Sequence, residues 1–469
     1  MNFSSTQYLV FISAVFLIYW HTRRPYQNLF LLLASYFFYA CWNGRFLSLI
    51  FLVTIVDYLC GARIHRARSA ASKKRWLALS LAVNIGTLGF FKYFNFFVET
   101  FVSAAHSIGW PASFSTLNIL LPIGISFYVF RSMSYSLDIY RGTLQPTRSF
   151  VDYALFVSFF PHLAAGPITR ATELIPQLER KRAFSGEDLE AGLTRFLWGF
   201  FNKTFIADTL AFYLVDPVFA APGKYSSATL WFAMVGYTLQ IYADFSGYSS
   251  MGIGSARILG FRLPENFDLP YMAVNISEFW RRWHMTMSRF FRDYIYFGLG
   301  GNRKGKGRAL FNVAVTTVAS GLWHGAGMTF ILWGALHGLY IVLYHFWSGR
   351  WARRAEPALY NLLPAWFFTQ AAVCLSRVLF RSADLSTASV YFKGLVSSSG
   401  METMEVPPLV WMAIFFFVID HVAGWMVQRN PGPAERIPVS LRAMAYAAMI
   451  LFLFHACLES ANAFIYFKF

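Results

Sequence analysis

Charge is scarce in this 469-residue sequence: Lys and Arg number 40, Asp and Glu 23, and together they make up 13% of the residues. This is about half the share that is usual in soluble domains. At roughly 100 to 200 residues per domain the length would allow about three soluble domains, but no polar segment is long enough to cover even one. Hydrophobic residues make up 57%. The composition therefore excludes a water-soluble protein, a disordered chain and a fibrous repeat.

Cysteine is also scarce, and several catalytic motifs are missing. The four cysteines, at 41, 60, 374 and 457, are far apart and form no CxxC pair, so neither a metal site nor redox work is expected. The sequence has no HExxH and no GxSxG motif. Residues 300–307 begin like a phosphate-binding loop, but Gly307 stands where such a loop needs Ser or Thr to hold magnesium. A flexible basic loop is the simpler interpretation.

What the sequence does contain is a series of long apolar runs. A membrane-spanning helix needs about 20 predominantly apolar residues. Such runs occur at about 7–20, 27–42, 46–60, 77–91, 94–110, 116–140, 150–168, 192–218, 228–260, 309–347, 362–380, 408–427 and 441–460. They predict an all-α integral membrane protein with roughly ten to twelve spans, organised as one polytopic domain over residues 1–469.

The basic residues, which give a net charge of +17, lie between these runs. We expect a loop at 61–76, which holds six basic residues and no acid, to face the cytoplasm, as the positive-inside rule requires. The basic segments at 281–308 and 350–354 are expected on the same side. This distribution favours a membrane over nucleic acid. The run at 7–20 lacks the features of a signal peptide, so we interpret it as a retained first span with the N-terminus outside.

Two polar interruptions, at 169–191 and 264–308, separate apolar runs. The second is rich in aromatic residues, which predicts amphipathic or half-inserted helices there rather than a plain linker. Prolines and glycines such as Pro122, Gly124 and Gly166 break other runs. Broken backbone at membrane depth is tolerated only where protein or a water-filled cavity satisfies it.

Histidines within or beside apolar runs are the main candidates for chemistry, because ionisable groups are costly there unless paired or hydrated. His324 is flanked by glycines at the end of an apolar run, and His337 follows 13 residues later. A neutral imidazole is well suited to accept a proton near pH 7. A hydrogen-bonded packing role is the alternative for each. His284 lies among Trp280, Trp283 and arginines, where a solvated interfacial patch is the alternative.

Charged and polar residues inside other runs add further candidates. Asp244 stands near Gln240, Tyr242 and Ser246, which could line a polar tunnel or satisfy one another and Arg257. Arg131 lies in an apolar run with Asp138 two helical turns on, on the same face but too far away for direct pairing.

Four motifs in order carry a resemblance to a known family: FPHLAAGP at 160–167, DFSGY at 244–248, EFWRRWH at 278–284 and WHG at 323–325. With them the sequence resembles the membrane-bound O-acyltransferase superfamily, in particular the bacterial branch that acetylates alginate and cellulose and transfers D-alanine to teichoic acids. It departs from that pattern at Arg131, where Glu or Gln is common, and at Ser250, where Asp is common.

The resemblance implies a ring of helices around a central funnel that leads to the superfamily histidine, which His324 matches. His284 matches the second, cytoplasmic-side histidine of the bacterial branch. It further implies a bacterial inner-membrane protein that passes an acetyl group from a cytoplasmic thioester, acetyl-CoA, to a periplasmic partner protein that modifies an exopolysaccharide.

On this interpretation His324 is the general base that takes a proton from the attacking hydroxyl, and His284 positions the donor or assists in proton transfer. Trp280, Trp283 and Trp323 would line the donor entrance, and Arg281 and Arg282 would attract the donor's phosphates. Two other functions remain open: a polytopic transporter or flippase, and a non-catalytic subunit that docks a periplasmic enzyme. Internal repeats, which a transporter would show, are not found.

Overall fold

The computed structural model describes residues 1–111, 113–114, 116–117, 119–351, 359–397, 402–430, 438–456 and 464. Part of the basic segment expected at 350–354, from residue 352 on, lies outside these residues, as do Cys457 and the residues 465–469. Within the described part the chain is helical, with one isolated β-bridge between Tyr225 and Glu402 and no strand. The all-α prediction is confirmed.

Five helical stretches of the described chain are long and apolar enough to cross a membrane: Arg24–Arg66, Ala70–Ser107, Met328–Ser348, Leu362–Arg381 and Pro408–Arg429. Thr6–His21 and Ser440–Leu453 are shorter apolar helices. These helices make the chain a multi-pass membrane protein. The number of ten to twelve spans stays a prediction, because length and hydropathy alone identify fewer.

The chain divides into two compact units. Unit 1 holds Met1–Phe196 and Gly252–Pro264. Its helices are α1 (Thr6–His21), α2 (Arg24–Asn43), α3 (Leu47–Arg66), α4 (Ala70–Leu88), α5 (Phe94–Ser107), α6 (Ile125–Arg141), α7 (Phe150–Ser158), α8 (Phe160–Leu163), α9 (Ala171–Glu179) and the first part of α10 (Gly186–Phe201).

Unit 2 holds Leu197–Met251 and Glu265–Phe469. Its helices are most of α13 (Ser227–Ile258), together with α11 (Asp208–Leu210), α12 (Asp216–Ala220), α14 (Ile276–Arg282), α15 (Met285–Phe290), α16 (Lys306–His324), α17 (Met328–Trp351), α18 (Leu359–Arg381), α19 (Leu385–Val396), α20 (Pro408–Arg429) and α22 (Val439–Ala456). Both units occur in one continuous chain, and the division does not test the single-domain interpretation, which stays a prediction.

Short 3-10 and π segments connect or interrupt these helices. The 3-10 segments are η1 (Gly44–Phe46), η5 (Pro222–Lys224) and η6 (Pro270–Met272). The π segments are η2 (Gly89–Tyr93), η3 (Asn202–Ala207), η4 (Ala211–Val215) and η7 (Phe291–Tyr296). Such π segments are frequent at functional sites. The short helices α14 and α15 fall within the aromatic-rich interruption at 264–308, where helices are predicted, and the short helix α9 lies in the other interruption, at 169–191.

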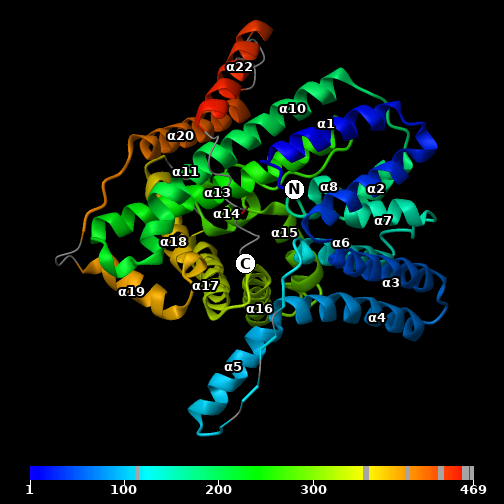
Figure 1. Ribbon diagram of the computed structural model, residues 1–469. Helices are drawn as coiled ribbons and strands as arrows, with labels where there is room; N and C mark the ends of the chain where they lie inside the picture. Colours follow the sequence, from blue (N-terminus) through cyan, green and yellow to red (C-terminus); the bar gives the residue numbers. More distant parts are fainter. Residues whose placement is uncertain are drawn as a thin grey trace. The chain divides into compact units, whose positions relative to one another are not determined.

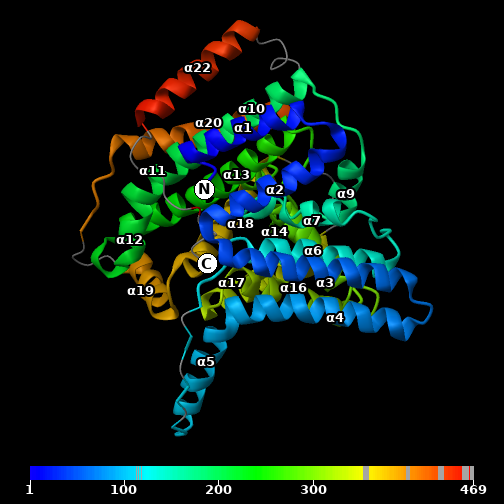
Figure 2. The same cartoon turned by 45° about the vertical axis from the view of Figure 1, so that its right-hand side comes forward.

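In unit 1, α3, α4 and α6 lie side by side (Figures 1 and 2). A buried carboxylate joins them: Asp57 on α3 accepts hydrogen bonds from Ser80 and Asn84 on α4 and from Ser136 on α6. Buried polar groups are retained where such bonds satisfy them. The prediction of a long loop at 61–76 is wrong, because α3 continues to Arg66 and α4 begins at Ala70. Basic residues in the last turn favour the negative end of a helix, so they extend α3 rather than end it.

The break predicted near Pro122 is confirmed, since α6 begins only at Ile125, after Gly124. Gly124 has φ +74°, and a Cβ there would lie 2.5 Å from the backbone oxygen of Leu163. Only glycine tolerates both conditions. The start of α6 therefore packs directly on the end of α8.

Arg131, which the sequence marks as costly, stabilises the second break in unit 1. It is completely buried. Its guanidinium donates to the backbone oxygens of His162 at 2.6 Å and Val157 at 3.1 Å, where α7 stops and α8 begins. Carbonyls at a helix end have no intrahelical partner. Arg131 supplies the missing donors, so no pairing with Asp138 is needed.

Candidate active site

The sequence places His324 at the point where α16 ends and the chain turns back into α17. Residues 325–327 form the turn. The two helices then pack with their backbones in contact at two glycines. A Cβ added at Gly321 would clash with the backbone oxygen of Phe330, and a Cβ added at Gly334 would clash with the backbone oxygen of Thr317. Small residues let helices approach this closely. The glycines around His324 therefore bring α17 against it.

Aromatic rings enclose His324, which is 1% exposed. Ring centroids lie 4.9 Å away for Trp323, 5.1 Å for Trp333 on α17 and 5.2 Å for Phe380 on α18. An apolar enclosure of this kind excludes water and strengthens every electrostatic interaction inside it.

His284 occupies a strained position between α14 and α15. Its φ of +41° lies in the left-handed region, which costs a residue with a side chain about 1 to 3 kcal/mol. Asn266 holds it there: the backbone oxygen of Asn266 accepts from Met285 N at 2.8 Å, and its side-chain Oδ1 lies 2.9 Å from His284 Nδ1. Thr286 donates to the same Oδ1 at 2.9 Å, and Asn266 Nδ2 donates to Ser249 at 3.2 Å.

This network determines the protonation of His284. Because Asn266 Oδ1 can only accept, His284 Nδ1 carries the proton and Nε2 carries the lone pair. His284 lies in the polar segment between apolar runs, and burial lowers its pKa to about 3. The imidazole is therefore neutral at physiological pH, and Nε2 is its acceptor atom.

The two histidines that the sequence singles out lie together, with ring centroids 6.4 Å apart. Trp323 adjoins both, at 5.8 Å from His284, and Phe245 of the DFSGY motif packs on His284 at 4.6 Å. Three motifs separated in sequence thus meet in unit 2. The catalytic roles of His324 and His284 stay predictions.

His337 is fixed by hydrogen bonds on both nitrogens. Trp280 Nε1 donates to its Nδ1 at 3.2 Å, and its Nε2 lies 2.9 Å from Ser376 Oγ, which itself donates to the backbone oxygen of Val373. The proton of His337 is therefore on Nε2. Both nitrogens are engaged, which favours the packing alternative for His337, and Trp280 is positioned by this bond.

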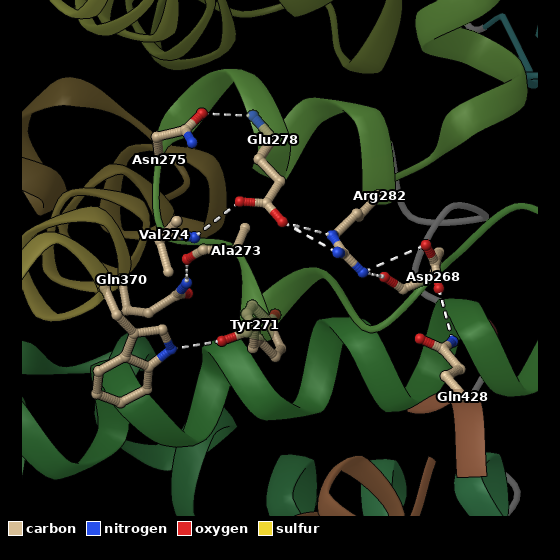
Figure 3. Close-up of polar contacts among 10 residues, drawn as sticks. Asp268, Tyr271, Ala273, Val274, Asn275, Glu278, Arg282, Gln370 and Gln428 are labelled. Carbon is tan, nitrogen blue, oxygen red and sulfur yellow. Dashed lines mark hydrogen bonds and ion pairs between the residues drawn. The ribbon is translucent and has the colours of Figure 1, made fainter. Parts of the chain in front are cut away.

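Figure 3 shows how Arg282 is held. It forms ion pairs with Glu278 at 3.0 Å and Asp268 at 3.3 Å, and Gln428 donates to Asp268 at 2.8 Å. Two carboxylates thus compensate its charge. Arg281, its neighbour, is exposed. Arg281 is therefore the better of the two for attracting phosphate groups.

Asp244 is buried and pairs with Lys203 at 2.7 Å, and Lys203 also contacts Asp208 at 2.7 Å. The sequence offered Arg257 as an alternative partner of Asp244. That prediction is wrong, because Arg257 pairs with Asp188 at 3.1 Å in unit 1. Asp244 thus belongs to a buried ion-pair network in unit 2.

The remaining candidates lie in the same unit. Trp283 is buried, and Tyr242 packs on it with ring centroids 6.2 Å apart and on His421 of α20 at 4.8 Å. Gln240 is buried, whereas Ser246 is partly exposed. Tyr242 and Trp283 contribute to an aromatic cluster next to His284, and tunnel-lining roles for Gln240 and Ser246 stay predictions.

Sequence reasoning missed Asn266, Lys203, Ser376 and Arg377. Lys203 and Arg377 carry a signal that could have found them, since each is a charge within an apolar run. Asn266 and Ser376 carry none, because their partners lie 18 and 39 residues away and depend on how the chain folds.

Among the described residues no group of three or more His, Cys, Asp or Glu could hold a metal ion. The site thus presents imidazoles and indoles in an apolar enclosure. Such a set suits proton transfer to and from an organic substrate.

Comparison with known proteins gives the same result as the motifs. A model of the membrane-bound O-acyltransferase family matches residues 144–376. The chain is 43% identical over 391 residues to the probable alginate O-acetylase AlgI of Azotobacter vinelandii, covering 83% of this chain and 76% of that protein. It is 42% identical over 409 residues to the protein of that name in Pseudomonas aeruginosa, covering 87% and 77%. It is 37% identical over 413 residues to a peptidoglycan O-acetyltransferase of Helicobacter pylori, covering 82% and 77%.

Proposed function

Because the chain belongs to the membrane-bound O-acyltransferase family and is an O-acyltransferase, we propose that it transfers acetyl groups from acetyl-CoA in the cytoplasm to an acceptor outside the inner membrane. The transferred acetyl group ends, through a periplasmic partner protein, on an exopolysaccharide such as alginate or cellulose. The single observation that carries the proposal is the approach of His284 and His324 to 6.4 Å within one buried aromatic enclosure.

The geometry supports a simple reaction sequence. His324 accepts the proton of the acceptor hydroxyl as its oxygen attacks the thioester carbonyl, which forms the C–O bond. The C–S bond then breaks, and the leaving thiolate takes the proton from His324. A general base with a pKa near the working pH contributes about 10² to 10⁴ in rate.

His284 acts differently, because its Nδ1 proton is committed to Asn266. Its Nε2 can only accept, so it holds a donor group such as an amide N–H of the pantetheine arm. Trp280 is fixed by His337, and together with Trp283 and Trp323 it shields this arm from water.

The orientation rests on the distribution of charge. The basic segments at 61–76 and 281–308 support a cytoplasmic side for these parts and a periplasmic side for the N-terminus, as the positive-inside rule requires. Reporter fusions that are active only in the periplasm test this directly: a fusion at the N-terminus should be active, and one at residue 68 should be inactive.

The experiment that tests the function measures thiol release from acetyl-CoA by the purified full-length protein with a hydroxyl acceptor. His324→Ala should lower the rate by about 10² or more. His345→Ala, which removes an exposed histidine from α17, is the matched control and should keep the wild-type rate. Equal rates for His324→Ala and wild type would contradict the proposal and favour a docking role.

A further inference from the structure

Arg377 on α18 is the exceptional charge of the site. Its guanidinium lies over the ring of Trp283, 4.2 Å from the centroid, and 5.8 Å from the centroid of Phe380. The residue is 1% exposed. Within the described part of the chain it has no acid partner and no hydrogen-bond acceptor, and its Nε is completely buried.

Two other buried cations in this protein have hydrogen-bond or ion-pair partners. Arg131 donates to backbone oxygens at the break between α7 and α8, and Lys203 pairs with Asp208 and Asp244. A buried charge without a partner is costly, and stacking on an indole compensates only part of the loss because it satisfies none of the N–H groups. The position of Arg377 therefore has a reason beyond packing.

A second donor without an acceptor lies nearby. Trp333 is 1% exposed, and its Nε1 has no hydrogen-bond partner among the residues that the structure describes. Its ring centroid is 5.0 Å from that of Phe380 and 5.1 Å from that of His324. Phe380 thus contacts the guanidinium, the indole and the imidazole of His324 alike.

The ionisable side chains near Arg377 agree with its position beside the two histidines His324 and His337. The charge of Arg377 acts on the side chains of Tyr237, Tyr271 and His337. The hydroxyl of Tyr237 is also buried and has no hydrogen-bond partner in the described residues. Arg377 is therefore enclosed within the protein, next to His337 and the buried hydroxyl of Tyr237.

We propose that Arg377, with the indole N–H of Trp333, is an anion subsite that binds a phosphate or carboxylate oxygen of a substrate beside His324. This proposal deepens the proposed function and rests on it for the identity of the substrates. The oxyanion comes from one of two sources: the phosphates of the acyl donor, or a uronate carboxylate of the exopolysaccharide, which would then bind this chain directly as well as the partner protein. Guanidinium groups match both in geometry.

Equilibrium binding to the purified full-length protein in detergent tests the proposal, and it does not require turnover. Two pairs of probes are compared, each with one charged and one neutral member: CoA with pantetheine, and an alginate oligosaccharide with a cellulose oligosaccharide. In Arg377→Gln the affinity for one charged probe should fall about 10- to 100-fold, while the affinity for its neutral partner stays within about twofold.

Variants keep the test independent of folding. Arg377→Lys retains the charge and should keep part of the affinity, and Trp333→Phe retains the ring and should weaken the same probe by a few-fold. Arg381→Gln removes an arginine one helical turn away that already pairs with Asp216 at 2.7 Å, and it should bind all four probes as the wild type does.

The outcomes are distinct. If Arg377→Gln loses affinity for CoA, the bound oxyanion is a donor phosphate. If it loses affinity for the alginate oligosaccharide, the bound oxyanion is a uronate carboxylate. The proposal is overturned if Arg377→Gln and wild type bind all four probes equally, or if charged and neutral probes weaken together. If binding depends on Arg377 but the wild type transfers no acetyl group, the subsite stands and the proposed function fails.

Discussion

Asn266→Asp replaces the side-chain amide nitrogen of Asn266 by an oxygen, and so turns the neutral acceptor that fixes the protonation of His284 into a carboxylate. In the wild type, Nδ1 donates to a neutral amide oxygen at 2.9 Å, and burial lowers the pKa of His284 to about 3. A carboxylate at the same place favours the imidazolium and should raise the pKa of His284 by roughly 1 to 3, to between about 4 and 6. Nε2 then becomes protonated under mildly acidic conditions and no longer accepts a hydrogen bond.

The assay is thiol release from acetyl-CoA by purified protein between pH 4.5 and 8. At pH 5, a pKa of about 5 would leave half of the variant molecules with a neutral His284, whereas about 1% of wild-type molecules would be protonated. The variant should therefore lose activity on acidification before the wild type does. Asn430→Asp, at an exposed position, is the control. Superimposable pH profiles for Asn266→Asp and wild type would refute the assignment of the Nδ1 proton.

Three further predictions concern stability and packing. Lys203→Met leaves two carboxylates buried without their cation and should lower the free energy of unfolding by about 3 to 5 kcal/mol in an unfolding titration. The control Arg257→Met breaks a partly exposed ion pair and should lower it by under about 1 kcal/mol. Equal losses for the two variants would contradict the assigned burial. Arg131→Met removes donors from carbonyls at a helix break and should cost about 2 to 5 kcal/mol, and an unchanged melting temperature would show that the break needs no such support. Gly334→Ala forces α17 away from α16 and should reduce transfer together with stability by about 1 to 3 kcal/mol, while Gly307→Ala, whose methyl would meet open space, should behave as wild type.

The fold class could be predicted from the sequence because apolar runs of spanning length have few structural alternatives. The runs at 7–20 and 27–42 became α1 and α2 with nearly the predicted bounds. The break signalled by Pro122 and Gly124 was also predicted, and α6 begins only at residue 125. The loop at 61–76 was predicted wrongly, because Arg63 and Arg66 lengthened α3 instead of forming a loop.

The candidate site could be predicted only in part. His324 and His284 stand in recognisable motifs, and the structure brings them together in unit 2. Their supporting residues could not be found in this way. Asn266 lies in an unremarkable polar stretch, and its bond to His284 depends on how two turns pack. Asp244 was visible as a charge, but its partner Lys203 lies in another helical run, and sequence spacing does not indicate such contacts.

The most direct test of the central claim is the acetyl content of the exopolysaccharide in cells that lack this protein and carry either the wild type or His324→Ala at equal membrane levels. The proposed mechanism predicts that the wild type restores acetylation and that His324→Ala does not. Equal restoration by both would contradict the role of His324 as the base for acyl transfer.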